Sequence, residues 1–226
     1  MKARLHYVKG HIGSEEQAMQ SLASFRRYGW DVELVEGVTP DTIDETEFTS
    51  KILGGSRLED FAAQDYRKFL VKKSCLFNNL RLMVDCVESN ESMIFLEHDS
   101  ICTANYEEFE FDEFCSLSYE YAFKEPTALA KYDWTPISLV KGVLPFCRTH
   151  PLQYYKNSIY KGSNMTPGTA AYAISPRGAM KVLDAVERNG IDQSDFLINS
   201  DVIKLDYLNP SPIRYANTNL NLSHTL

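Results

Sequence analysis

The sequence predicts an α/β fold in which a mixed, mostly parallel sheet is flanked by helices. Three observations support this fold class. A strand–helix–strand unit fills residues 4–35, an apolar strand at 93–96 ends abruptly in acidic residues, and a compact strand at 170–174 leads directly into a capped helix. Strands that alternate with helices are typical of sheets whose strands run largely in one direction.

The first unit begins with a short strand at residues 4–8. Ser14-Glu15-Glu16-Gln17 has the form of a capping box, so we expect a helix from there to Gly29. Residues 31–35 alternate apolar and polar side chains, which predicts a second strand. The acidic stretch 37–47 contains a proline and is expected to form a loop.

Two helices are expected before the central strand. Ser56-Arg57-Leu58-Glu59 has the pattern of a second capping box and predicts a helix that reaches Phe69. A longer amphipathic helix is expected at 74–89, because apolar side chains recur there on one face. This helix leads directly into the strand that begins at Met93.

The second half of the chain predicts strands at 113–117 and 137–143, followed by a long polar loop at 149–166. Order then returns with the strand at 170–174. Ser175-Pro176 places a capping hydroxyl before a proline at the first helical position, and Asn189-Gly190 ends that helix. A last strand is expected at 201–208, and the tail 209–226 is expected to be irregular.

Composition bounds the class of protein. The 226 residues are 44% hydrophobic and carry a net charge of −8, which argues against a partner that is duplex nucleic acid. No window is apolar enough to span a membrane, and the amino terminus lacks the apolar core of a signal peptide. The five cysteines show no Cys-x-x-Cys spacing and indicate reduced thiols. We therefore expect a cytoplasmic protein with a single domain over residues 1–226.

Acidic residues at the end of the central strand provide the main functional hypothesis. Glu97 and Asp99 follow the apolar run 93–96, and strand alternation predicts that both project to the same side at its carboxyl end. Ligands of open α/β sheets bind at that edge, and paired carboxylates suit a divalent cation that carries a diphosphate. The alternative is that these acids only return the chain to solvent. Dinucleotide, Walker, zinc-protease and nucleophile-elbow motifs are absent from the sequence.

Three segments, in this order, resemble glycosyltransferase family 25. Residues 74–82 (SCLFNNLRL) are similar to the family's helix before the metal strand, and 88–99 (ESNESMIFLEHD) to its apolar strand ending in an acidic triplet. Residues 168–179 (GTAAYAISPRGA) resemble its Gly-x-x-Ala-Tyr strand and the helix that follows. The resemblance implies a GT-A-like fold, a nucleotide-sugar donor and a glycan or other hydroxyl acceptor. It also implies a divalent metal, for which we expect Mn²⁺ rather than Mg²⁺, and inversion at the sugar carbon.

Specific residues receive roles from this hypothesis. Asp99 and Glu97 are the expected metal ligands, although Glu97 alternatively contacts the ribose or the base of the donor. His224 could supply a nitrogen ligand to the same cation, or remain a solvated residue of the tail. Asp195 or Asp192 is expected to be the general base that takes the proton of the acceptor hydroxyl, and the alternative for each is a helix or turn cap.

Substrate-binding roles are expected for Arg81, Asn79, Gly168 and Tyr172. Arg81, with Lys72 and Lys73, would offset diphosphate charge, and the alternative is a solvated basic face of the helix. Gly168 would allow close approach of donor or acceptor, or simply form a turn. Asn79 lies in the first segment that resembles the family, and Tyr172 is either a sugar platform or a core residue. Other functions stay open: a binding module without turnover, a sugar nucleotidyltransferase, or a purely structural protein.

Overall fold

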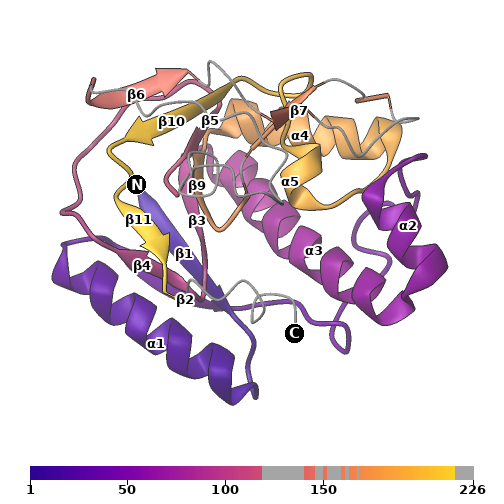
Figure 1. Cartoon of the computed structure of the whole chain (residues 1–226), viewed down its shortest axis with the longest axis horizontal. Coiled ribbons are helices and arrows are strands. Elements are labelled where there is room, and N and C mark those ends of the chain that lie inside the picture. Colours follow the sequence, from indigo (N-terminus) through magenta and orange to yellow (C-terminus); the bar gives the residue numbers. More distant parts are fainter. Residues whose placement is uncertain (119–139, 146–149, 152–158, 161–162, 167, 217–226) are drawn as a thin grey trace, which may run out of the picture.

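The computed structural model describes residues 1–118, 140–145, 150–151, 159–160, 163–166 and 168–216. Its main sheet has seven strands in the spatial order β2-β1-β3-β9-β5-β10-β6 (Figure 1). In chain order these strands are β1 (Lys2–Tyr7), β2 (Val32–Glu36), β3 (Met93–Glu97), β5 (Phe114–Ser116), β6 (Gly142–Pro145), β9 (Ala171–Ile174) and β10 (Leu205–Asn209).

Strand directions confirm a mixed, mostly parallel sheet. β1 pairs in parallel with both β2 and β3, and β5 pairs in parallel with β10. β9 is antiparallel to its neighbours β3 and β5, and β6 is antiparallel to β10. β1, β2, β3, β5 and β10 therefore run in one direction, while β9 and β6 run in the other. The arrangement is consistent with a GT-A-like fold.

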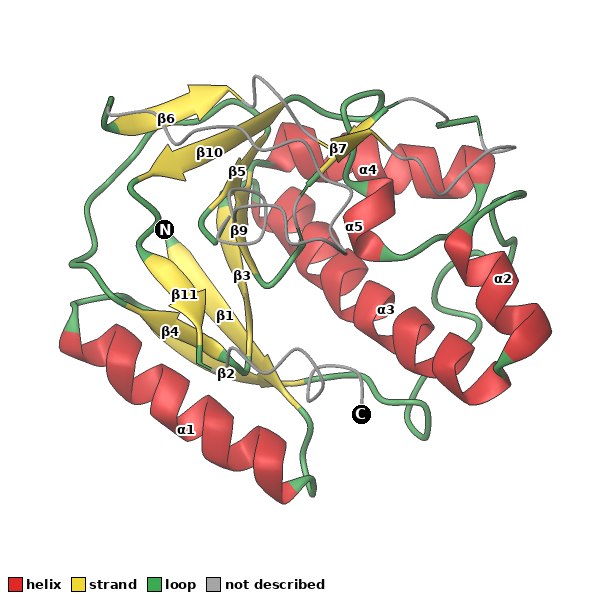
Figure 2. Cartoon of the chain, viewed as in Figure 1, coloured by secondary structure: helices red, strands yellow, loops and turns green. Residues whose placement is uncertain are grey.

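Helices cover both faces of the sheet, as Figure 2 shows. α1 (Ile12–Arg27) packs on one face, where Leu22 and Phe25 meet Leu5 and Ile94. α3 (Tyr66–Ser89) and α4 (Pro176–Asn189) pack on the other face, where Phe95 and Tyr172 belong to the larger core. The remaining elements are α2 (Arg57–Gln64), α5 (Ser194–Leu197), and the paired short strands β4 (Ser100–Cys102) with β11 (Ile213–Tyr215) and β7 (His150–Pro151) with β8 (Asn164–Met165).

The caps predicted from sequence explain where several helices begin. The Ser56 hydroxyl accepts a hydrogen bond from the Glu59 amide, and the Ser175 hydroxyl accepts one from the Gly178 amide, which satisfies amides at the starts of α2 and α4. α4 ends at Gly190, whose φ of +108° is a conformation that glycine adopts without strain.

Other boundaries differ from the prediction. α1 begins at Ile12 because the His11 ring, rather than Ser14, accepts the capping hydrogen bond. α3 begins at Tyr66, eight residues before the expected 74, because Asp65 caps it directly after α2 ends. β10 begins at Leu205 rather than at 201, since residues 200–202 form a turn. Of the strand expected at 137–143, residues 137–139 lie outside the described residues, and β6 covers only part of the rest.

Candidate functional site

The candidate site lies at the sheet edge where β1, β3, β5 and β10 end. Glu97 is the last residue of β3, and its amide donates a 2.8 Å hydrogen bond to the carbonyl of Ala170, just before β9. Because β9 runs against β3, the start of β9 reaches the same edge. The carboxyl ends of the parallel strands and the loop that leads into the antiparallel strand β9 therefore meet at this edge, where the sequence hypothesis places the ligand.

The structure corrects the reason given for placing Asp99 beside Glu97. β3 ends at Glu97, and Asp99 lies in the turn before β4, so strand alternation does not fix its direction. The turn is instead held by the carbonyl of Asp99, which accepts a 2.6 Å hydrogen bond from the amide of Ala216. The two carboxyls still influence one another, because the charge of Asp99 raises the pKa of Glu97.

Electrostatics identifies the side chains that share this region with Glu97. The pKa of Glu97 is raised to about 8, first because burial desolvates the carboxylate, and then because Asp99 and Asp195 are negative. The ammonium group of Lys72 acts in the opposite direction and lowers it. The pKa of Asp99 is also raised, again chiefly by burial. Acids from β3, from the following turn and from α5 thus lie close enough to repel one another.

Asp195 and Asp192, the alternative general bases, have different environments. Asp192 is 1% exposed, and its Oδ1 accepts hydrogen bonds from the amides of Leu58 (3.1 Å) and Gln193 (2.8 Å). Asp192 therefore caps the first turn of α2, which is the alternative that the sequence left open for it. Asp195 is only partly buried on α5, and its charge acts on Glu97. Of the two, Asp195 belongs to the acidic edge.

The face of α3 toward this edge carries Cys75, a residue to which sequence analysis gave no role at the site. Lys72, Cys75 and Asn79 follow an i, i+3, i+7 spacing, which puts them on one side of the helix. Cys75 is exposed as a residue, but the protein atoms around its thiol desolvate the thiolate, and this desolvation, followed by the negative charge of Glu97, raises the pKa of Cys75 to about 11. Lys72 stands in the sequence among other basic residues, and the helical spacing is the pattern that places both Lys72 and Cys75 on the face toward the edge.

Asn79 and Tyr172, both expected as substrate-binding residues, lie buried below the acidic edge, and for Tyr172 this is the core position that the sequence left open. Asn79 is 1% exposed and Tyr172 is fully buried. The Tyr172 hydroxyl donates a 2.6 Å hydrogen bond to Oδ1 of Asn79, and the Tyr172 ring stacks between Phe95 and Phe114. Their physical role in this structure is to join β9 to α3, because both polar groups are satisfied by each other.

Three further residues were expected at the site: Arg81, Gly168 and His224. The Arg81 guanidinium donates two 2.6 Å hydrogen bonds to the carboxylate of Glu47. In this structure Arg81 therefore binds the loop before α2 rather than facing a ligand. Gly168 has a φ of +102°, and a β-carbon there would lie 3.2 Å from the Tyr215 hydroxyl. Glycine is therefore required for the backbone, whether or not a ligand approaches it. His224 lies outside the described residues.

Polar atoms without partners gather at the same edge. Within the described residues, the buried side-chain atoms that lack a hydrogen-bond partner belong to Arg4, His6, Asp99, Ser116 and Ser118. Apart from Arg4, these residues lie at or just beyond the carboxyl ends of β1, β3 and β5. Such groups are costly to bury and uncommon, so their concentration here indicates an edge built to meet polar ligand atoms.

The carboxylate oxygens at this edge suit a divalent cation that keeps several water ligands. In the part of the chain that is described, no group of three or more His, Cys, Asp or Glu side chains is placed to hold a metal ion alone. A magnesium-like ion needs only one or two carboxylates when water and phosphate oxygens complete its shell. The unpartnered Oδ1 of Asp99 and the mutual repulsion of Asp99 and Glu97 fit an ion of that kind.

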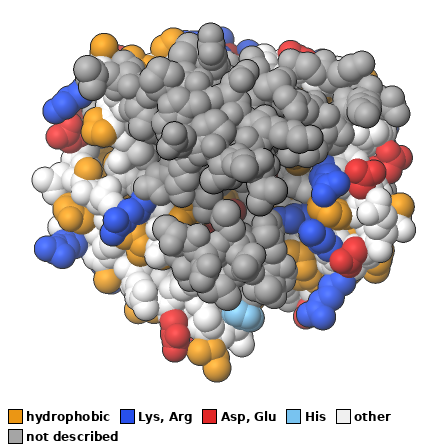
Figure 3. Space-filling view, in the orientation of Figure 1, with side chains coloured by type: hydrophobic (Ala, Val, Ile, Leu, Met, Phe, Trp, Pro, Cys, Tyr) orange, Lys and Arg blue, Asp and Glu red, His pale blue; other side chains and the backbone are white. Residues whose placement is uncertain are grey.

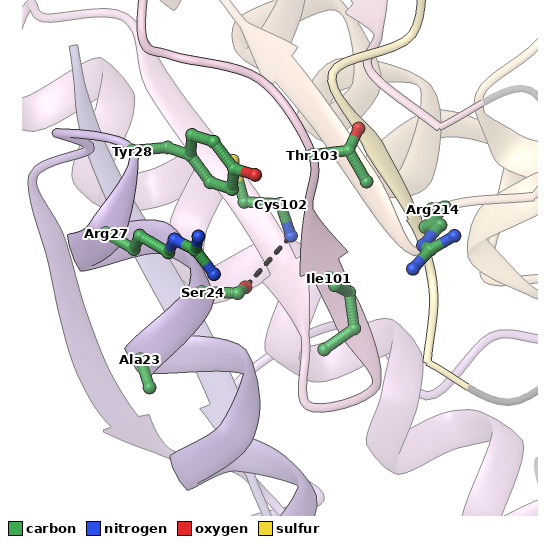
Figure 4. A pocket seen from close by; sticks show the side chains of 8 residues that line it. All are labelled: Ala23, Ser24, Arg27, Tyr28, Ile101, Cys102, Thr103 and Arg214. Atoms are coloured by element: carbon green, nitrogen blue, oxygen red, sulfur yellow. Dashed lines mark hydrogen bonds between the residues drawn. The ribbon is translucent and has the colours of Figure 1, made fainter.

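A separate shallow cavity of about 450 Å³ lies between the end of α1 and the β4–β11 pair (Figure 4). The arginine side chains of Arg27 and Arg214 stand on its two sides, and the Ser24 hydroxyl accepts a 2.9 Å hydrogen bond from the Cys102 amide at its floor. None of the acidic residues at the edge of the sheet lines it.

Comparison with known protein families decides the class of this chain. A model of glycosyltransferase family 25 (LPS biosynthesis protein) matches residues 13–198, which is most of the chain. The chain belongs to glycosyltransferase family 25. Membership of family 25 confirms the resemblance of the three segments and supports a transferase that handles a sugar donor and an acceptor. No curated protein matches the chain. Among the described residues of this family-25 member, no helix is both long and apolar enough to cross a bilayer.

Proposed function

We propose that this chain transfers a hexose from a nucleotide-diphosphate donor to the hydroxyl group of a glycan or similar acceptor. The reaction would depend on a divalent cation, Mn²⁺ rather than Mg²⁺, and would invert the configuration at the sugar carbon. The observation that carries the proposal is the convergence of Glu97, Asp99 and Asp195 at the carboxyl edge of the sheet. Family membership supports the same reaction class.

In the proposed transfer, the acceptor oxygen forms a bond to the anomeric carbon while the bond from that carbon to the diphosphate oxygen breaks. The bonding electron pair leaves with the diphosphate. Asp195 takes the proton of the acceptor hydroxyl, which makes that oxygen a better nucleophile as the proton leaves. Attack from the side opposite the leaving group inverts the configuration. Asp195 suits this role because it lies on α5, a different element from the strand and turn that carry Glu97 and Asp99.

Asp99 would hold the cation, and Glu97 would either share it or bind the donor nucleotide. The buried Oδ1 of Asp99, which has no partner in the described residues, is the atom best suited to a metal. When bound, such a cation supplies positive charge to the diphosphate oxygens. Glu97 needs a nearby positive charge to be ionised at neutral pH, because its pKa is raised to about 8 by burial and neighbouring acids.

Turnover of sugar nucleotides tests this function. The protein would be incubated with uridine and guanosine diphosphate hexoses, Mn²⁺ and a panel of glycan acceptors, and both the released nucleotide and the new glycoside would be measured. Asp99→Asn and Asp195→Asn should each lower turnover on the order of 10²-fold or more without lowering the melting temperature. Asp31→Asn is the matched control, because Asp31 is exposed and directly precedes β2, at the opposite edge of the sheet.

The same assay separates the alternatives. Nucleotide binding without any transfer would favour a binding module, and formation of pyrophosphate from a nucleoside triphosphate and a sugar 1-phosphate would favour a nucleotidyltransferase. Full activity of the Asp99→Asn protein, or undiminished activity after chelation of divalent ions, would refute the proposed use of a metal.

A further inference from the structure

α3 is aligned so that its first half extends past the acidic edge. Near the end of the helix, the Cys86 thiol lies 3.5 Å from the carbonyl oxygen of Ile174. Two turns earlier on the helix, Asn79 accepts the hydrogen bond from the Tyr172 hydroxyl. α3 therefore runs against β3, and its earlier residues lie nearer the carboxyl edge of the sheet. Lys72 precedes Asn79 by seven residues, which corresponds to about 10 Å along the helix axis.

The distance along β3, from the level of Tyr172 to Glu97, is shorter than the distance along α3 from Asn79 to Lys72. Phe95 is the register partner of Tyr172, and from Phe95 to Glu97 the strand advances about 7 Å. The backbone of Lys72 is therefore level with, or just beyond, the turn that contains Asp99. Since Lys72 shares a helix face with Cys75 and Asn79, its side chain leaves the helix on the side of the acidic edge.

Two other basic residues of α3, Lys73 and Arg81, are already in ion pairs. The Lys73 ammonium is 2% exposed and forms a 2.7 Å ion pair with Glu45, and Arg81 is paired with Glu47. Both pairs fasten the loop before α2 to the helix. Lys72 is only partly buried and has no ion-pair partner among the residues that the structure describes. Figure 3 shows several Lys and Arg side chains in the region of this helix.

Lys72 faces the acids without pairing with them. It shares a helix face with Cys75 and lies level with the turn that contains Asp99, so its ammonium group faces the same region, and its charge lowers the pKa of the Cys75 thiol. It nevertheless makes no direct ion pair with Glu97, Asp99 or Asp195. A cation that faces carboxylates without contacting them is placed to bind an anion lying between the two, such as a phosphate group held on its other side by a metal ion.

We propose that Lys72 is a catalytic residue that contacts the diphosphate of the donor and stabilises it as the leaving group. This inference rests on the proposed glycosyl transfer and names a residue for it. When the bond from the sugar carbon to the diphosphate oxygen breaks, that oxygen gains negative charge, and the ammonium group of Lys72 stabilises it by a charge-assisted hydrogen bond. Lys72 keeps its proton throughout, so it acts as an electrostatic and not an acid catalyst.

Calorimetric binding of diphosphates and nucleosides tests the assignment without knowledge of the sugar. The wild type would be titrated with uridine, cytidine, guanosine and adenosine diphosphates, and then with the nucleoside of whichever diphosphate binds best. Lys72→Met should weaken the binding of that diphosphate at least tenfold and leave the nucleoside affinity within twofold. Lys72→Arg should restore much of the diphosphate affinity. Arg67→Met is the control, because Arg67 is exposed on the same helix but on another face.

The outcomes distinguish this inference from the function on which it rests. If the wild type binds none of the diphosphates, both the proposed function and the role of Lys72 fail. If the wild type binds one and Lys72→Met binds it equally well, only the role of Lys72 is overturned. The loss in Lys72→Met should persist without Mn²⁺, because the contact is made by the protein, and a loss that appears only with Mn²⁺ would also contradict the assignment. Where a donor is turned over, kcat should fall more than KM rises.

Discussion

The hydroxyl of Tyr172 and the amide oxygen of Asn79 are 2.6 Å apart in the interior, and this hydrogen bond links β9 to α3 across the larger core. Asn79 also donates a 2.8 Å hydrogen bond to the carbonyl oxygen of Cys75, one turn earlier on α3. The chain of contacts runs from the centre of the sheet to the helix face that carries Cys75. The position of that face relative to the acidic edge therefore depends on this buried hydrogen-bonded pair.

Removing the Tyr172 hydroxyl should destabilise the fold. In Tyr172→Phe the amide oxygen of Asn79 stays buried and loses its partner, so we expect the free energy of unfolding to fall by about 1–3 kcal/mol. Urea unfolding followed by circular dichroism measures this change. Tyr66→Phe is the control, since Tyr66 is 63% exposed. Equal stability of the two variants would mean that the hydrogen bond contributes nothing.

Gly178 should tolerate no side chain. A β-carbon at Gly178, in the first turn of α4, would overlap the carbonyl of Glu113 at the start of β5, and backbone atoms yield little. Gly178→Ala should lower the free energy of unfolding by about 1–3 kcal/mol or more, because α4 must move away from the sheet. Gly54→Ala is the matched control, since a β-carbon there has open space around it. A Gly178→Ala protein as stable as Gly54→Ala would contradict the close packing.

Local patterns were enough to predict much of the fold. Ser56 and Ser175 lie within three residues of the amides that they cap, so a short window of sequence contains both partners. The same holds for the apolar run that forms β3. The start of α3 was missed because Asp65 both ends α2 and caps α3, which leaves no loop between the two helices to mark the boundary.

The site was less predictable because its partners are distant in sequence. Asp192 caps an amide 134 positions away, and Tyr172 bonds to a residue 93 positions away. No spacing rule connects such residues, so sequence alone could not distinguish Asp192, a buried cap, from Asp195, the proposed base. The acids that end β3 could be found, since their relation to the apolar run is local. Which other side chains face them follows only from the packing of α3 and α5 on the sheet.

Acid should destabilise the protein in part through His6. The ring of His6 is 8% exposed and stacks on Phe95, and burial lowers its pKa from 6.5 to about 4. An unfolded chain binds a proton at His6 near pH 6.5, while the folded chain does so only near pH 4. The stabilisation is therefore complete above pH 6.5 and is lost as the pH falls toward 4, by about 3 kcal/mol in total.

Comparison of the wild type with His6→Phe isolates this contribution. The substitution keeps a flat ring against Phe95 and removes the titrating group. Unfolding free energies measured in urea at pH 7.5 and at pH 4.5 should decrease less in His6→Phe than in the wild type. Identical pH dependence of the two proteins would show that protonation of His6 is not coupled to folding.

The Cys75 thiol offers a direct chemical probe of the acidic edge. Cys75 is exposed, whereas Cys86, Cys102 and Cys115 are buried, so an alkylating reagent should reach Cys75 first among these residues. The reaction should be slow, because the pKa of Cys75 is raised to about 11 and little thiolate forms near neutral pH. Mass spectrometry of the peptides after timed treatment with iodoacetamide measures the rate at each cysteine separately.

Two changes should alter that rate in opposite directions. Glu97→Gln should speed alkylation of Cys75 at pH 9, where Glu97 is ionised in the wild type, because removing the negative charge lowers the pKa of the thiol. A bound nucleoside diphosphate with Mn²⁺ should slow alkylation by covering the helix face that carries Lys72 and Cys75. Glu59→Gln is the control, since Glu59 lies on α2 and its charge does not act on Cys75. A rate that neither Glu97→Gln nor the nucleotide changes would mean that Cys75 does not share a site with Glu97.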